Sequence, residues 1–151
     1  MLETLSSSAF AQALAQSQVA TAGLSAVHLL GFTLVMASGL LAGLRWLGVI
    51  FVERPVTEMM PAASKALAVG LGISVVTGAL LVLPRAPGAA ANEFFRAKMF
   101  LLLAVIGFHV VIQRRLAVRA SSGQAVVWVG ALGLALNLAL ALSAGAFILL
   151  E

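Results

Sequence analysis

Cysteine is absent from this 151-residue chain, and charged residues are scarce. Without cysteine the chain cannot form a disulfide, supply a thiolate nucleophile or hold an iron–sulfur cluster on its own. Only 9% of the residues are charged, whereas a soluble domain carries about 25% because its surface must face water. The nine Lys and Arg residues are scattered rather than gathered on one face, which excludes a nucleic-acid-binding domain.

Catalytic motifs are missing as well. No Asp or Glu lies inside a long apolar segment, which excludes paired carboxylates and an embedded acidic proton carrier. No glycine-rich loop leads into a helix as a phosphate-binding loop would. We therefore expect no catalytic activity from the chain alone, although a role within a larger enzyme stays open.

Hydrophobic residues, in contrast, make up 62% of the chain. About 20 apolar residues cross a bilayer as a helix, and four segments come close to or exceed that length: 19–44, 66–83, 94–112 and 126–150. The sequence therefore predicts an all-α fold, a single transmembrane domain over residues 1–151 whose four helices form a bundle in the lipid bilayer.

Residues 1–18 precede the first predicted helix and lack the features of a cleavable signal peptide. The first helix is therefore expected to act as the targeting signal. Within this segment, a short helix over residues 5–16 and a stretch without fixed structure are both open.

Proline and glycine mark the expected ends of the helices. Pro61 suits the start of the second helix, where its missing N–H costs least. Pro84, Pro87 and Gly88 predict the end of that helix and a turn. Residues 121–123 are expected to separate the third helix from the fourth.

The basic residues predict the orientation in the membrane. Six of them flank the first and third loops and three flank the second: Arg45, Arg54, Lys65, Arg114, Arg115 and Arg119 against Arg85, Arg96 and Lys98. Basic residues accumulate on the cytoplasmic side. We therefore expect loops one and three in the cytoplasm and both termini outside, on the periplasmic face of a bacterial inner membrane.

Small residues predict where the helices pack. Lipid tails are as apolar as leucine, so membrane helices associate through close backbone approach and internal polar contacts. We expect Gly39, Gly43, Gly70 and Gly133 to lie at such contacts. Asn137, near the middle of the fourth helix, is expected to form a hydrogen bond to another helix.

Both histidines lie in apolar segments, where an ionisable side chain is a candidate functional residue by default. His28 lies 17 residues before Arg45, which marks the inner membrane edge on its helix. Lys98 lies 16 residues before Arg114, the corresponding marker on the third helix, so both side chains are about 25 Å from that edge. His109, only five residues before Arg114, differs from His28 in depth by about 18 Å, which argues against one haem iron held by both histidines.

The outer candidate site combines His28 with Lys98. A histidine there could ligate a metal or a haem iron, or handle protons, and the lysine charge favours a haem propionate, a lipid phosphate or a quinone oxygen. Alternatives stay open for each residue. His28 could be a neutral imidazole bonded to a nearby hydroxyl or carbonyl, Lys98 and Arg96 could extend to the headgroups, and His109 is expected at the membrane interface.

Three stretches carry a family resemblance: His28-Leu-Leu-Gly31 with Leu44-Arg45-Trp-Leu-Gly48, then Val76-Thr77-Gly78, then Asn92-Glu-Phe-Phe-Arg96-Ala-Lys98. Over about residues 17–115 the chain resembles a family of small bacterial inner-membrane proteins of unknown function, with a loose likeness to copper-resistance-type membrane proteins. The resemblance implies the four-helix fold and marks His28, Arg45, Thr77, Gly78 and Lys98 as motif positions. The Asp that usually precedes the arginine is replaced here, so the resemblance implies no ion pair for Arg45 within its helix.

Together these features predict a non-catalytic membrane subunit or partner of a bacterial redox system. Its outer pocket, formed by His28, Thr77 and Lys98, would bind haem b or a quinone, with His28 as the candidate ligand of the haem iron. Another membrane subunit or a second copy of the chain could complete this pocket.

Two other function classes stay open. In a structural or assembly subunit without a cofactor, Arg45, Asn137 and His109 would only hold the helices together. A small transport or metal-handling protein is the other class, and five methionines without any cysteine give it little support.

Overall fold

The computed structural model describes residues 2–113, 115–116 and 126–149, which form helices and no strand. The elements are α1 (Leu2–Ser6), α2 (Ala9–Gln16), α3 (Gln18–Trp46), α4 (Val56–Val82), η1 (Leu83–Arg85), α5 (Ala86–Ala91), α6 (Glu93–Gly107), η2 (Phe108–Gln113) and α8 (Val127–Leu149). In the described part of the chain, four helices are long and apolar enough to cross a membrane. The predicted all-α class and the presence of four helices long and apolar enough to span a membrane are confirmed.

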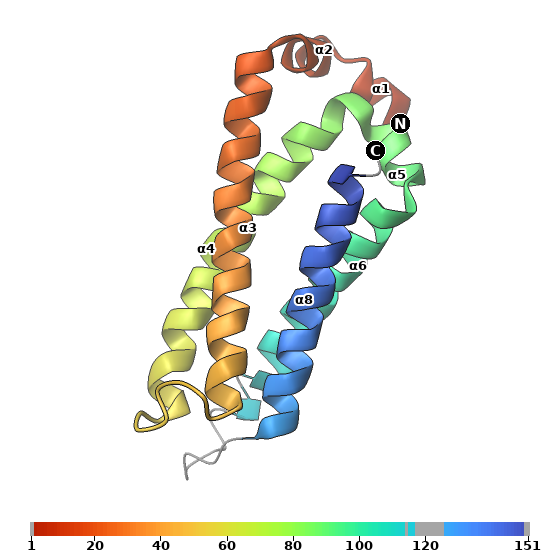
Figure 1. Ribbon diagram of the computed structural model, residues 1–151. Coiled ribbons are helices and arrows are strands. Elements are labelled where there is room, and N and C mark those ends of the chain that lie inside the picture. The colour runs from red at the N-terminus through yellow and green to blue at the C-terminus, as the bar shows by residue number, and fades with distance from the viewer. Residues whose placement is uncertain (1, 114, 117–125, 150–151) are drawn as a thin grey trace.

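The four long helices form a bundle in which α3 packs on both α4 and α8, and α6 packs on α8 (Figure 1). The chain begins with α1 at one end of the bundle, where α5 lies and α8 finishes. We call this the terminal end. The opposite end, where residues 47–55 connect α3 to α4, is the loop end. Which end faces the cytoplasm stays a prediction.

The second spanning helix begins ten residues earlier than expected. α4 starts at Val56, and Pro61 lies inside it rather than at its entry. Pro55 precedes the first turn in an extended conformation, and Val56 and Met60 are both buried in the core. Burial of this first turn outweighs the hydrogen bond that Pro61 cannot donate.

The second spanning helix ends where expected, because α4 ends at Val82 and the predicted end is residue 83. Two short helices, η1 and α5, follow in place of an open turn, and Arg85 at their junction has a non-helical backbone (φ −121°, ψ 24°). Each of the two prolines lies in the first two positions of its short helix, where a missing N–H leaves no bond unmade. Asn92 then interrupts the helical backbone again, because it is extended and accepts hydrogen bonds from the N–H groups of Phe94 and Phe95 at 2.9 and 3.1 Å. An asparagine cap therefore starts α6. The break predicted at residues 121–123 lies outside the described residues.

The N-terminal segment forms two short helices, so a short helix is the correct alternative for most of residues 5–16. The Ser8 hydroxyl caps α2 by accepting from the Ala11 N–H, and Ala11 is fully buried. Both α1 and α2 pack against η1, and α1 also packs against α5. The segment therefore covers the terminal end of the second spanning helix.

Glycines allow the long helices to approach closely, as predicted for Gly39, Gly43 and Gly70. A Cβ added to Gly70 would lie 2.6 Å from the Gly31 carbonyl oxygen, which marks the closest approach of α4 to α3. A Cβ on Gly43 would lie 2.7 Å from Leu134 Cδ2 of α8, and one on Gly39 would overlap the Asn137 amide. Gly31 was not predicted to lie at a helix contact, because the sequence has no second glycine four residues before or after it.

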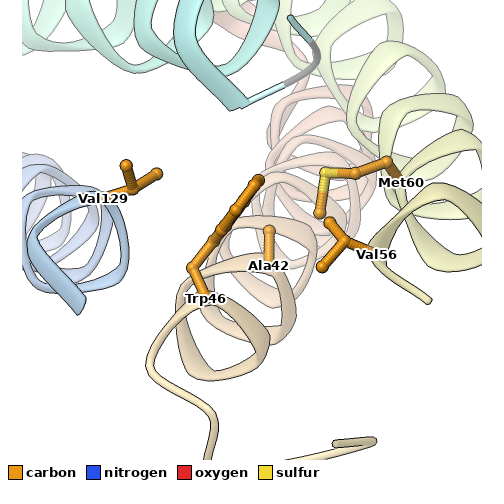
Figure 2. Packing of buried hydrophobic residues seen from close by; sticks show 5 residues of the cluster. All are labelled: Ala42, Trp46, Val56, Met60 and Val129. Atoms are coloured by element: carbon orange, nitrogen blue, oxygen red, sulfur yellow. The ribbon is translucent and has the colours of Figure 1, made fainter. Parts of the chain in front are cut away.

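A cluster of buried apolar residues joins three helices at the loop end. Figure 2 shows the Trp46 indole of α3 between Val129 of α8 on one side and Val56 and Met60 of α4 on the other, with Ala42 one turn away. Trp46, Ala42 and Val129 are fully buried. Aromatic side chains bury the largest area in such clusters, so Trp46 fixes α3, α4 and α8 together at this end.

Candidate functional site

His28 of α3 contacts Thr77 of α4 near the terminal end of the bundle. The His28 Nδ1 atom lies 3.0 Å from the Thr77 Oγ1 atom. Thr77 is buried, whereas the His28 side chain is only partly buried. The structure thus brings together two residues that were predicted as one site.

A second hydrogen bond of Thr77 decides which nitrogen of His28 carries a proton. The Thr77 hydroxyl donates its single hydrogen to the Ile73 carbonyl oxygen at 2.6 Å. Its oxygen can therefore act only as an acceptor toward His28, so Nδ1 must be the protonated nitrogen. In the neutral ring Nε2 then holds a lone pair, the form of histidine that binds a metal or accepts a proton.

Gly78 lies directly beneath the His28 ring. A Cβ added at Gly78 would lie 3.0 Å from His28 Cε1 and 3.4 Å from Nδ1. The absence of a side chain at this position therefore gives the ring its place next to Thr77.

We expect the Gly78→Ala substitution to displace the His28 ring by a few tenths of an ångström and to weaken whatever binds at Nε2. The matched control is Gly72→Ala on the same helix, because no other group lies within 4 Å of a Cβ added there. The nitrogen-15 chemical shifts of the His28 ring, measured for both variants, check the prediction. Equal shifts in the two variants would show that the ring position does not depend on Gly78.

Lys98 of α6 reaches toward the same region of α3. Its Nζ atom lies 5.9 Å from the centre of the Phe32 ring, and Phe32 follows His28 by one helical turn. This distance is within the range of a cation–π contact. The ammonium also interacts electrostatically with the His28 ring. Arg96, in contrast, is exposed and faces Glu93 at 3.9 Å, as expected for a surface residue.

His109 is buried inside the bundle, and its expected depth at the membrane interface stays a prediction. Its side chain is 4% exposed, and its Nε2 atom lies 2.8 Å from the Ser64 hydroxyl of α4. The side chain belongs to η2, a π-helix that continues α6, and shares its buried face with Val105. Packing against α4 rather than depth along the helix decides its environment.

The two histidines form separate sites. His28 contacts Thr77 and His109 contacts Ser64, and these two partners lie 13 residues apart on α4. At 1.5 Å per residue this separation is about 20 Å along the helix axis. The geometry agrees with the depth predicted from the sequence and gives each histidine its own surroundings.

Asn137 does not form the expected hydrogen bond to another helix. Its Nδ2 group donates to the Gly133 carbonyl of its own helix at 2.8 Å, and its Oδ1 atom has no partner among the described residues. The amide lies flat against Gly39 and lines a cavity of about 10 Å³ together with His109. Close packing of α3 on α8 leaves the amide no polar group to meet on α3.

Arg45 is a buried residue of the loop end. Its side chain is 1% exposed and donates from Nη2 to the Arg54 carbonyl oxygen at 2.7 Å. No ion pair to Arg45 occurs within the part of the chain that the structure describes. The residue therefore fixes the loop between α3 and α4, about 25 Å along α3 from His28.

A family model matches residues 9–147, from α2 almost to the end of α8. The chain belongs to DUF6644, a family of unknown function. This match confirms the resemblance to a family of unknown function. The matched residues include all the candidate site residues of this DUF6644 protein. No curated protein and no solved structure matches the chain. The expected likeness to copper-resistance-type proteins has no support.

Two residues of these sites were missed from the sequence. Phe32 could have been found, because it follows His28 by one turn and so lies on the same face. Ser64 precedes Lys65 at what looked like the edge of a loop, and only the earlier start of α4 places it inside the bundle.

Proposed function

We propose that this DUF6644 protein is an integral membrane subunit or partner of a bacterial redox system that binds haem b or a quinone at His28. The observation that carries the proposal is the hydrogen-bond chain from His28 Nδ1 through Thr77 Oγ1 to the Ile73 carbonyl. This chain leaves Nε2 with a lone pair on a side chain that is only partly buried. We assign the protein to the bacterial inner membrane, with the terminal end on the periplasmic side.

The residues present fit a haem iron better than a bare metal ion. Among the described residues, no three His, Cys, Asp or Glu side chains come together as a metal-binding group. A haem brings most of the ligands of its iron in its own ring, so His28 Nε2 alone could hold it from this chain. The Thr77 hydroxyl would hold the ring orientation, which is the usual role of a partner on the second nitrogen. Lys98 would pair with a propionate.

A quinone requires the same two groups. In its reduced form it would donate a hydroxyl proton toward His28 Nε2, and in its oxidised form it would accept a hydrogen bond from the Lys98 ammonium. Phe32, which already contacts Lys98, would offer an aromatic face to the ring. Haem and quinone therefore share the same requirements. Each is a membrane-soluble redox group with oxygen atoms that could bind the Lys98 ammonium and with an electrophilic or acidic centre that could bind the His28 lone pair.

The test is to purify the protein from its native membranes without added cofactor. An absorption spectrum of the oxidised and dithionite-reduced protein detects a haem, and chromatography of an organic extract detects a quinone. We expect a Soret band or a quinone that copurifies with the folded chain in constant ratio. A folded protein with neither would overturn the proposal and favour a structural subunit, in which the His28–Thr77 bond only joins α3 to α4.

A further inference from the structure

The terminal part of α3 is polar on one side and apolar on the other. At 100° per residue, Gln18, Thr21 and Ser25 lie within about 80° of His28 around the helix axis. Val19 and Leu30 lie on the opposite side and are 85% and 65% exposed. An exposed apolar side at this depth suits lipid, whereas the polar side suits water.

A concavity of about 340 Å³ lies on this polar side, at the corner between α2 and α3. It is lined by Ala15, Gln16, Gln18, Thr21, Ala22 and Ser25. The Thr21 hydroxyl donates to the Leu14 carbonyl oxygen at 3.1 Å, which holds α2 at its angle to α3. The Ser17 hydroxyl accepts from the Ala20 N–H at 3.3 Å and caps α3 at the same corner.

His28 does not line the concavity but lies next to it along α3. Ser25 is the deepest residue of the concavity along α3, and His28 follows Ser25 by three residues, so their side chains are neighbours on one face. Phe32, which contacts Lys98, continues the same face by one more turn. The polar residues thus form a row from the surface of the terminal end to the candidate site.

We propose that this concavity is a water-filled entrance through which water and protons reach His28 from the terminal end. The use of the entrance, proton exchange at a cofactor bound to Nε2, rests on the proposed function. The entrance itself does not, because it is defined by the polar row on α3 and by the corner with α2.

The absence of cysteine from the chain makes a direct test practical. Single variants Ser25→Cys and Thr21→Cys are prepared in the full-length protein, with Val27→Cys as the matched control. Val27 is at nearly the depth of Ser25 but lies about 160° away around α3, and it is exposed on the apolar side. Gln12→Cys, on the exposed surface of α2, reports which side of the membrane the terminal end faces.

A membrane-impermeant maleimide is added to membrane vesicles of each orientation. We expect the Ser25→Cys variant to react from the same side as Gln12→Cys and at least about tenfold faster than Val27→Cys, because a thiol in apolar surroundings is poorly ionised. The proposed entrance would be wrong if both Ser25→Cys and Thr21→Cys reacted no faster than Val27→Cys. It would also be wrong if they reacted only from the side opposite to Gln12→Cys. If the Ser25→Cys variant does not accumulate in membranes, the rate of the Thr21→Cys variant decides.

This result is independent of cofactor binding. If the wild-type protein contains no haem or quinone but the Ser25→Cys variant is labelled fast, the proposed function is wrong and the proposed entrance is supported. If a cofactor copurifies but the Ser25→Cys variant is labelled slowly, the proposed function is supported and the proposed entrance is wrong.

Discussion

Replacement of Gly39 by alanine is expected to lower the free energy of unfolding by about 3 kcal/mol, because a methyl group would be forced into a fully packed helix contact. A Cβ at this position would overlap the side-chain amide of Asn137, which is 7% exposed and bonded to its own helix. The amide has little room to retreat, so α3 and α8 must separate. Thermal unfolding in detergent, followed by size-exclusion chromatography of the heated samples, measures the loss.

Two glycines provide matched controls for this prediction. Gly23 on α3 and Gly72 on α4 have no other group within 4 Å of an added Cβ, so alanine there should be neutral or slightly stabilising through its helix propensity. The Asn137→Ala substitution should reduce the cost of Gly39→Ala, since it removes the overlapping atoms, and the double-mutant cycle measures this coupling. A Gly39→Ala variant as stable as Gly72→Ala would show that α3 and α8 do not pack as described.

The His28→Ala substitution is expected to abolish the copurification of haem or quinone while the bundle stays folded. The hydrogen bonds to the Thr77 hydroxyl and to the Ser74 backbone are lost, and each such bond contributes about 1 kcal/mol to stability. Loss of Nε2, in contrast, removes the group that engages the cofactor. The Soret absorbance or the extracted quinone, divided by the amount of folded protein, measures the effect.

The second histidine is the control. His109→Ala removes a buried side chain bonded to Ser64 and should cost about 2 kcal/mol of stability. Because His109 is about 20 Å from the His28 site along α4, the folded fraction should retain its full cofactor content. If His109→Ala depletes the cofactor as strongly as His28→Ala, the assignment of the site to His28 is wrong.

Three of the helices were predictable to within two residues at each end: α3, α8, and the helix predicted over 94–112, which α6 and η2 together form over 93–113. α3 and α8 have no proline or charged residue in their interiors, so hydropathy alone defines them. The start of α4 was missed because Glu58 and Pro61 make its first turn look like a loop. The end of α4 near Pro84 was predicted correctly, but the short helices η1 and α5 that follow were not, because proline also suits the first positions of a helix.

Separation along the helix axes was also predictable, whereas direction around each helix was not. Residue counts separated His28 from His109, and the hydrogen bonds to α4 give a similar distance. The surroundings of each side chain depend on how the helices rotate against each other, which glycine contacts such as Gly31 with Gly70 decide. For this reason the burial of His109 was not predicted, and Asn137 was expected to bond to a neighbouring helix.

The protonation pattern of the His28 ring tests the account most directly. Nitrogen-15 NMR of the protein labelled at histidine, after extraction of any bound cofactor, resolves the two ring nitrogens, and the His109→Ala variant assigns the signals. We predict a neutral ring with its proton on Nδ1 and a free lone pair on Nε2, and a loss of this preference in the Thr77→Val variant. A ring of His28 protonated on Nε2 would contradict the hydrogen-bond chain to Ile73 and the proposed role of the site.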